Sequence, residues 1–528
     1  MELHLDLSAP HDVRPLDHFW SRVVGAGRAN EGLRADWQQQ LRDARNTGGF
    51  EYLRFHGLFH GDMFVYRETN GVVDPYFQYV DLLFDALRDA GIRPFVEFGF
   101  SPPELARETG TVFWWGANGS PPTDYDKWAQ LVRASVTHWI SRYGIDEVLQ
   151  WYFEIWNEPN LDPFFRGTKS EYFELYRVSV AAIKAVDARL RVGGPATSNF
   201  VPDARFDGET EDLSQHAVVL EAEDLDALDW KPVWLTEFLD FCARESLPVD
   251  FVSCHPYPTD WALDSHSQGR KLTRGVDATP TDLRTLRRLV DASAYPNAEI
   301  HLTEWNSSSS PRDYTHDYPQ AATFVVKANL ESLGLVDSLA YWTFSDIFEE
   351  NGAGQEPFHG GFGMISQHGI PKPTMHAYRM LNALGDELVH QQSGAVVTRH
   401  SESGNLAVLA YHYPPEVTLT VPGSFESREV ADATLAAGSD EPFSVRLAGL
   451  PAGARYSLEV VDRTHGSAMA EWKRLGSPNN LSRSDVAAIA GAAGRGQVTS
   501  YMASADGVLT IDVPLAPWSI ALLAPDIS

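Results

Sequence analysis

Two glutamates, Glu158 and Glu304, stand in settings that suit acid–base and nucleophilic chemistry. Each follows a short apolar run that predicts a strand, and asparagine and tryptophan side chains accompany both. A pair of carboxyl groups can hydrolyse a glycosidic bond, because one protonates the leaving oxygen while the other attacks the sugar or activates water. The structural alternative is that Glu158 caps the following helix and Glu304 pairs with Arg54.

The apolar runs that precede these glutamates belong to a pattern that extends from about residue 15 to 385. The predicted strands are Phe19–Val24, Glu51–Phe55, Ile92–Phe98, Gln150–Trp156, Leu190–Gly193, Val249–Cys254, Glu299–Glu304 and Ser338–Phe344. Apolar residues three and four apart predict helices between them, at Tyr76–Ala90, Tyr125–Arg142, Tyr172–Ala188, Trp234–Glu245, Thr281–Ala292 and Ala321–Leu333. Repeated strand–helix units predict an α/β fold, a (β/α)₈ TIM barrel over residues 15–384. The alternative is an open doubly wound sheet, but Gly25–Asn30 lacks the third glycine of its phosphate-binding loop.

After Leu384 the pattern changes to short, often alternating runs separated by glycine, proline and serine. Such runs predict an antiparallel β-sandwich as an accessory domain of residues 385–528. Its expected strands are Ala395–Arg399, Leu406–Tyr411, Glu416–Val421, Phe443–Leu447, Tyr456–Val461 and Val508–Val513. Leu3, Leu5 and Leu7 alternate as well, so residues 1–14 are expected to add a strand to this sandwich. A helix closed by Gly491 is predicted at Ser484–Ala490. We expect the sandwich to support the barrel rather than to bind polysaccharide.

In a TIM barrel the side chains at the C-terminal ends of the strands assemble into one site. Carboxylate, imidazole, amide and indole groups gather at the predicted strand ends. Asn157 can donate a hydrogen bond to a sugar hydroxyl, and apolar faces for a sugar ring are expected from Trp156, Trp305 and Trp342. Glu154 is expected to point into the barrel and to pair with Arg54 for structural reasons.

Three other patterns carry no prediction of chemistry. Glu237 lies in a sequence that nearly repeats the one around Glu304, but its helical spacing places it on an exterior helix. His56 and His60 stand four apart without the glutamate of a zinc protease motif. Cys242 and Cys254 lack the spacing of zinc ligands. No metal and no other cofactor is therefore expected.

The excess of acidic residues limits the kinds of molecule that this protein is expected to bind. Forty-two Lys and Arg residues stand against 72 Asp and Glu residues, which gives a formal net charge of −30. An acidic surface of this kind repels polyanions, so neither nucleic acid nor an anionic membrane is expected as a partner. No basic and apolar leader and no run of 18 apolar residues occurs, so a cytoplasmic location is expected, or a secreted or periplasmic one if a signal peptide was removed. The sequence leaves open whether the chain forms a homo-oligomer.

The strand-end motifs resemble those of a known family. EIWNEPN at Glu154–Asn160 and LTEWN at Leu302–Asn306 are similar to motifs of retaining glycoside hydrolases that have a catalytic (β/α)₈ barrel. Further matches are YLRFHG at 52–57, RYGI at 142–145, VDFVSCH at 249–255, YWTFSDIFEE at 341–350, FHGGFG at 358–363 and IPKPT at 370–374. Together they resemble glycoside hydrolase family 39 and, within it, the β-xylosidases.

This resemblance implies that Glu158 is the acid/base and Glu304 the nucleophile of a retaining, exo-acting β-D-xylosidase. Its substrates would be short, neutral xylo-oligosaccharides. The residues implied to line or approach the sugar subsite are His56, Phe113, Asn157, His255, Tyr257, Trp342, Glu349 and Glu350. The family often has a tyrosine just after the nucleophile, where this sequence has Ser307–Ser310, and Tyr314 is the candidate to replace it.

Electrostatics assigns the same roles to the two glutamates. Arg54, at the mouth of the barrel, is expected to keep Glu304 ionised, and the negative Glu304 then favours the protonated form of Glu158. Two alternatives within the family are an α-L-arabinofuranosidase or other pentosidase, and a uronic-acid hydrolase. A uronate would need cationic contacts where the sequence offers Glu349 and Glu350. A carbohydrate-binding protein without turnover is a further alternative, against which the presence of both glutamates argues.

Overall fold

The computed structural model describes residues 1–201, 227–263, 269–424 and 427–526. Within them, eight parallel strands close into a barrel in which each strand pairs with the next along the chain, and the last with the first. The strands are β3 (Val23–Arg28), β4 (Tyr52–His56), β7 (Arg93–Phe98), β10 (Tyr152–Ile155), β11 (Arg191–Ser198), β14 (Phe251–His255), β17 (Glu299–Trp305) and β18 (Ser338–Tyr341). The closed barrel confirms the predicted fold and excludes the open sheet.

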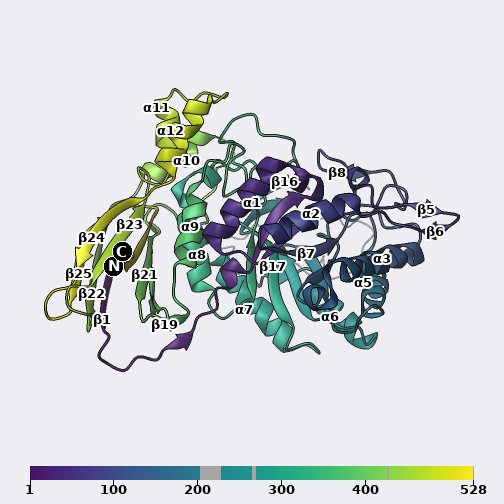
Figure 1. The fold of residues 1–528 in the computed structure, drawn as a ribbon, viewed down its shortest axis with the longest axis horizontal. Coiled ribbons are helices and arrows are strands. Elements are labelled where there is room, and N and C mark those ends of the chain that lie inside the picture. Colours follow the sequence, from purple (N-terminus) through teal and green to yellow (C-terminus); the bar gives the residue numbers. More distant parts are fainter. Residues whose placement is uncertain (202–226, 264–268, 425–426, 527–528) are drawn as a thin grey trace.

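Helices surround this barrel (Figure 1). Their bounds are α1 (Ala35–Gly48), α2 (Gln78–Asp89), α3 (Tyr125–Tyr143), α4 (Ile145–Val148), α5 (Lys169–Lys184), α6 (Leu235–Arg244), α7 (Ala278–Asp291), α8 (Pro319–Glu331) and α9 (Pro373–Asn382). The helix predicted from Tyr172 begins earlier, because Thr168 and Glu171 form a capping box at its N-terminus. Glu237 lies on α6, as expected. No helix in the described ranges combines the length and hydropathy that a membrane span requires.

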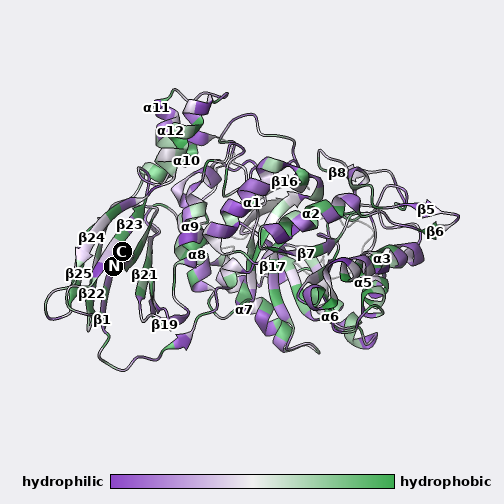
Figure 2. Cartoon of the chain, in the orientation of Figure 1, coloured by the Kyte–Doolittle hydropathy of each residue, from purple (hydrophilic) through white to green (hydrophobic). Residues whose placement is uncertain are grey.

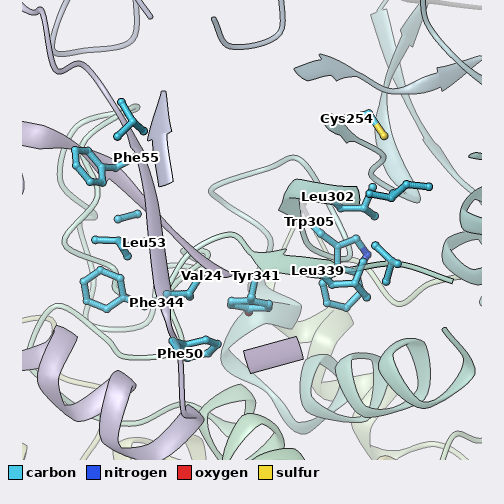
Figure 3. Close-up of a cluster of buried hydrophobic side chains, with 14 of the residues drawn as sticks. Val24, Phe50, Leu53, Phe55, Cys254, Leu302, Trp305, Leu339, Tyr341 and Phe344 are labelled. Carbon is cyan, nitrogen blue, oxygen red and sulfur yellow. The ribbon is translucent and has the colours of Figure 1, made fainter. Parts of the chain in front are cut away.

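The outer face of the barrel carries the main hydrophobic core. Side chains alternate along each strand, so Leu53 and Phe55 on β4 and Leu302 on β17 point outward to the helices, where Figure 3 shows them packed. Helices such as α2 present apolar residues to this layer and polar residues to solvent, and both kinds are visible along α2 in Figure 2. α8 is buried along nearly its whole length. Cys242 and Cys254 are buried in the same core as free thiols. The remaining positions on each strand therefore face the barrel interior.

The C-terminal region forms two further sheets. One has the order β2-β19-β20-β21-β26-β23-β24 and the other β1-β22-β25, and hydrophobic side chains from both form one cluster. Their bounds are β1 (Glu2–Asp6), β2 (Arg14–Pro15), β19 (Glu387–Gln392), β20 (Ala395–Arg399), β21 (Leu406–His412), β22 (Glu441–Ala448), β23 (Arg455–Val461), β24 (Gln497–Met502), β25 (Leu509–Leu515) and β26 (Ser519–Pro525). β1 joins this region as expected. The division into 15–384 and 1–14 plus 385–528 stays a prediction, which these pairings support.

Two expectations for this region need correction. Glu416–Val421 is not a strand of the sandwich, because Thr420 forms an isolated bridge with Gly275 and the Val421 N–H donates to Arg274 on the barrel side. The helix predicted to end before Gly491 is α12 (Arg483–Ala493), which continues past that glycine because Ala493 packs into a buried cluster. The short strands of the loops are β5 (Glu68–Thr69), β6 (Val72–Val73), β8 (Thr111–Val112), β9 (Ala117–Asn118), β12 (Phe200–Val201), β13 (Lys231–Pro232), β15 (Thr259–Leu263) and β16 (Gly269–Thr273).

A helical insertion of the C-terminal region packs on loops of the barrel. It consists of α10 (Arg428–Ala436), α11 (Met469–Arg474) and α12, at the top of Figure 1. Its buried cluster includes Phe358 from the loop between β18 and α9. The Arg428 guanidinium donates to the Phe358 carbonyl oxygen at 2.7 Å and lies over the Tyr314 and Trp472 rings at 4.8 and 4.6 Å. Arg428 thus holds a barrel loop against the insertion.

We expect Arg428→Met to lower the midpoint of thermal unfolding. The change keeps an apolar stem but leaves the Phe358 carbonyl without this donor, and such a loss costs about 1–3 kcal/mol. Arg474→Met is the matched control, because Arg474 is exposed and its one ion-pair partner among the described residues is Glu471 on its own helix. A chain ending at Leu384 that stays stable and fully active would refute the supporting role of the C-terminal region.

Candidate active site

The barrel interior is layered, and polarity increases toward the C-terminal ends of the strands. The lowest layer is apolar and consists of Val23, Tyr52, Phe95, Tyr152, Phe251 and Ala340. Two residues further along β4, β7 and β10, the inward side chains are Arg54, Glu97 and Glu154, all completely buried. The next inward positions on β4 and β14 are His56 and His255. Because side chains alternate along the strands, the inward positions place a series of ionisable groups from the middle of the barrel up to its mouth.

Arg54 is the centre of this series. Its guanidinium contacts Glu154 and Asn157 at 2.9 Å, Glu97 at 3.1 Å and Glu304 at 2.5 Å. Burial acts to lower the pKa of Arg54, but the surrounding carboxylates outweigh it and raise that pKa above its usual range. Both partners expected for Arg54, Glu154 and Glu304, are therefore present, whereas the sequence analysis did not identify Glu97. Arg54 supplies the permanent positive charge of the site.

Glu304 is held by both oxygens of its carboxylate. Arg54 donates to Oε1, and the Tyr257 hydroxyl donates to Oε2 at 2.9 Å. Burial, together with the charge of Glu304, raises the pKa of Tyr257 well above its usual range, so the hydroxyl stays a donor. The pairing of β17 with β18 shifts register between Leu302 and Trp305, which re-aims the end of the strand. Glu304 is thus fixed as an oriented acceptor at the mouth.

Glu158 follows β10 on a strained turn. Trp156 and Glu158 have φ angles of 71° and 47°, in the left-handed region that bulky residues rarely occupy. Such strain is concentrated at functional sites. Glu158, His255 and Glu304 each offer a ligand-type atom, and these atoms lie within 4.8 Å of one another. The two carboxylates therefore lie close together across the mouth of the barrel. The same three atoms have the types that ligate a metal ion, but Arg54 already pairs with Glu304 and supplies a positive charge to it.

A chain of hydrogen bonds leads from Glu158 into the barrel. His255 Nδ1 lies 3.0 Å from Glu158 Oε1, and its Nε2 lies 2.9 Å from Thr303 Oγ1. The Thr303 hydroxyl donates to Glu154 at 2.7 Å, so its oxygen is left to accept from His255 Nε2–H. Burial lowers the pKa of His255 to about 4, against the opposing charge of Glu304. His255 is then neutral near pH 7, and its Nδ1 accepts a hydrogen bond from the protonated carboxyl group of Glu158. The network favours a protonated Glu158.

Thr303→Val tests this chain of hydrogen bonds. Valine removes the acceptor of His255 Nε2–H and the donor to Glu154, so the tautomer that serves Glu158 is no longer favoured. One hydrogen bond is worth about 0.5–1.5 kcal/mol, so turnover with a poor leaving group should fall roughly two- to tenfold. The alkaline limb of the pH–kcat/KM profile should move to lower pH.

Ser253→Ala is the matched control for this variant. Ser253 is also buried, points inward from β14, and its hydroxyl has no partner among the residues that the structure describes. An unchanged pH profile in Thr303→Val, or an equal change in Ser253→Ala, would contradict the hydrogen-bond chain as drawn.

The two glutamates open into a cavity of about 190 Å³. Its lining residues are His56, Phe113, Asn157, Glu158, Leu161, Phe164, Ser198, Tyr257, Glu304, Ser309, Trp342, Glu350 and Phe362. His255 lies behind this lining in contact with Glu158. Leu161, Phe164 and Phe362 were missed, because they lie on loops whose path no periodicity indicates. Ser198 was missed because β11 extends to it, beyond the predicted end of that strand at Gly193. Burial, with the charges of Glu304 and Glu158, raises the pKa of Glu350 well above its usual range.

Glu349 does not line the cavity, contrary to the expectation. Its carboxylate pairs with Arg28 at 2.9 Å and with Arg34 at 2.8 Å, which turns it away toward β3 and the segment that follows. The neighbouring Glu350 lies 3.7 Å from His56 and faces the cavity instead. Two consecutive carboxylates in an irregular loop point in different directions, and the sequence cannot distinguish them.

Of the three tryptophans expected to offer a face to the sugar, one lines the cavity and two are buried elsewhere. Trp342 lines the cavity as expected. Trp156 donates to the Phe164 carbonyl and is completely buried, and Trp305 stacks on Phe324 of α8. Neither therefore offers a face to a sugar. Tyr314 does not replace the tyrosine of the family, because its ring lies under the Arg428 guanidinium and does not line the cavity. Ser309 lines the cavity instead, from the stretch that follows Glu304.

Comparison with known proteins agrees with this geometry. Residues 3–510 match the family model described as glycosyl hydrolases family 39. The chain is 35% identical over 520 residues to a beta-xylosidase of Geobacillus stearothermophilus, covering 96% of this chain and 92% of that protein. It is 35% identical over 509 residues to a beta-xylosidase of Caldicellulosiruptor saccharolyticus, covering 96% and 94%.

A solved structure extends the likeness to the fold. The monomeric beta-xylosidase from Caulobacter crescentus CB15 superposes with a TM-score of 0.83 at 31% identity, over 100% of both chains. The family match covers the barrel, the paired glutamates and most of the C-terminal region. The chain is a glycoside hydrolase and belongs to glycosyl hydrolases family 39.

Proposed function

We propose that this glycoside hydrolase is a retaining, exo-acting β-D-xylosidase that releases xylose from the non-reducing end of short xylo-oligosaccharides. The observation that carries the proposal is the short separation of the two glutamates, whose facing oxygens lie within 4.8 Å. Carboxyl groups of retaining enzymes are about 5–5.5 Å apart, whereas inverting enzymes need roughly 6.5–9.5 Å to admit a water molecule. This closest approach of the two carboxylates supports the narrower spacing of a retaining enzyme.

In the first half-reaction, Glu304 attacks the anomeric carbon while Glu158 protonates the leaving oxygen. Arg54 and Tyr257 orient the attacking carboxylate through its two oxygens. His255, neutral above its pKa of about 4, accepts from the protonated Glu158 and keeps it in the form that an acid requires. The glycosidic bond breaks, a bond from Glu304 to the sugar forms, and the leaving group departs with the proton of Glu158.

In the second half-reaction, water releases the sugar from Glu304. The covalent bond removes the negative charge of Glu304, so Glu158 is left ionised beside the intermediate. Glu158 takes a proton from a water molecule as its oxygen attacks the anomeric carbon from the face that the leaving group vacated. The bond from the sugar to Glu304 breaks, and Glu304 becomes a carboxylate again. Two displacements at the same carbon return the original anomeric configuration, with Glu158 protonated again.

The cavity suits a single neutral pentose. Its volume of about 190 Å³ is below the roughly 300–1,000 Å³ of pockets that hold drug-sized ligands. Trp342 and Phe362 offer apolar walls, and Glu350 and Asn157 offer polar groups to ring hydroxyls. No Lys or Arg side chain is among the described lining residues, so a uronate carboxylate would meet no cationic partner there. A cavity of this size favours xylose over a sugar with an additional hydroxymethyl group. The two beta-xylosidases named above, 35% identical to this chain, support the same substrate.

Hydrolysis of 4-nitrophenyl β-D-xylopyranoside, measured beside the β-D-glucopyranoside and the α-L-arabinofuranoside, tests the substrate. The xyloside should have the highest kcat/KM, with lower but measurable activity on the related pentoside, because a wall of this kind discriminates by only about 1–3 kcal/mol. Products from xylan should be xylose rather than mixed oligomers. A preference for the arabinoside, or rapid release of long oligomers, would overturn the substrate or the exo-action.

A further inference from the structure

Trp114 lies at the rim of the cavity and is 67% exposed. It follows Phe113, a lining residue, in the turn between β8 and β9. Its backbone N–H donates to the Glu350 carbonyl at 2.6 Å. A Cβ added to Gly352 would lie 3.7 Å from the Trp114 indole. Of the tryptophans whose burial the structure describes, Trp114 alone is largely exposed. A backbone segment tied to two lining residues, Phe113 and Glu350, thus carries an indole that is accessible to solvent.

The turn that carries Trp114 also packs on the loop that begins at Glu158. The Phe113 and Phe164 rings are 5.2 Å apart, and the Arg166 N–H donates to the Gly119 carbonyl just after β9. In a retaining glycosidase the leaving group departs on the side of the acid/base. Trp114 is therefore placed beside the loop that carries the acid/base and outside the cavity that holds the cleaved sugar.

Arg312 is a second unusual side chain at this rim. One guanidinium nitrogen donates to the Gly352 carbonyl at 3.3 Å and another to the Pro311 carbonyl at 2.7 Å. Among the described residues Arg312 donates to backbone carbonyls and forms no salt bridge, and the charge of Asp346 acts on it only from a longer distance. Arg312 donates to Gly352, and a Cβ added to the same glycine would lie 3.7 Å from the Trp114 indole. Ser309, three residues before Arg312, lines the cavity.

We propose that Trp114 and Arg312 form the subsite for the leaving group, where the indole face stacks on the pyranose ring of the second xylosyl unit. This inference rests on the proposed function. A pyranose ring has an apolar face of C–H groups that matches a flat indole, and its rim of hydroxyl groups accepts hydrogen bonds from a guanidinium. The subsite would take neutral pyranosides, and it would orient the glycosidic oxygen toward Glu158.

Two substrates separate this role from a general effect on the site. Xylobiose fills the proposed subsite with a xylosyl ring, whereas β-D-xylopyranosyl fluoride loses only a fluoride ion and leaves the subsite empty. In Trp114→Ala, kcat/KM for xylobiose should fall about tenfold, at the low end of what one apolar contact gives, with less than a twofold change for the fluoride. Trp114→Phe should retain most of the xylobiose activity. Arg312→Gln should lower kcat/KM for xylobiose a few-fold and leave the fluoride unchanged.

Phe64→Ala is the matched control. Phe64 is 63% exposed, but it packs against Tyr79 and lines a separate cavity of about 390 Å³. Its loss should change neither substrate. An equal loss on both substrates in Trp114→Ala, or full activity on xylobiose, would overturn the subsite. A wild-type chain that hydrolyses neither substrate would instead refute the proposed function itself.

Discussion

Glu304→Ala is expected to abolish hydrolysis of xylosides with every leaving group, by a factor on the order of 10⁴–10⁶, because no covalent intermediate can form without the nucleophile. Arg54 and Tyr257, which hold the two oxygens of Glu304, would then border an empty space on the attacking face. Added azide can enter that space and displace an activated leaving group in one step. The product should be a xylosyl azide of inverted anomeric configuration, identified by NMR.

Glu237→Ala is the control for this variant. The sequence around Glu237 nearly repeats that around Glu304, but Glu237 lies on the exterior helix α6. Its removal should leave kcat and KM unchanged. Residual turnover of Glu304→Ala near the wild-type rate, or azide product of retained configuration, would contradict the nucleophile assignment.

In Glu158→Ala, the loss of hydrolysis rate is expected to depend on the leaving group. Xylobiose needs a proton on its leaving oxygen, and general acid–base catalysis is worth about 10²–10⁴-fold, so its hydrolysis should fall by that factor. A 4-nitrophenolate leaves without protonation, so the first step should survive and the covalent intermediate should accumulate, because no base activates water. Azide should attack this intermediate from the face that Glu158 occupied and yield a xylosyl azide of retained configuration.

The two variants together test which glutamate has which role. If Glu158→Ala gave the inverted azide and Glu304→Ala the retained one, the roles would be reversed. Full activity of both variants on xylobiose would show that neither glutamate is catalytic.

The barrel could be predicted because its signals are local and repeated. Apolar runs separated by amphipathic segments located all eight barrel strands. The first prediction, Phe19–Val24, overlaps β3 only at Val23 and Val24, because Phe19–Ser21 forms a 3-10 helix. The strand predicted at Glu416–Val421 was wrong, since the backbone of this segment bonds to the barrel side at Arg274–Val276 rather than to a strand of the sandwich. Helix α12 extends beyond Gly491 because burial of Ala493 outweighs the low helix propensity of glycine.

The site was predictable where it depends on strand alternation and less so where it depends on loops. Arg54 and His255 follow from the inward parity of β4 and β14. The direction of Glu349 depends on Arg28 and Arg34, which are distant from it in the sequence. The hydrogen bonds from His255 to Thr303 and on to Glu154 join three strands, and no single segment reveals them.

The configuration of the first product tests the central claim most directly. Proton NMR, recorded during rapid hydrolysis of 4-nitrophenyl β-D-xylopyranoside at a high enzyme concentration, resolves the two anomers of xylose before they interconvert. Because the facing oxygens of Glu158 and Glu304 lie within 4.8 Å, β-xylose should appear first and α-xylose only later, by mutarotation. Initial formation of α-xylose would show a single displacement by water and would contradict the double displacement through Glu304.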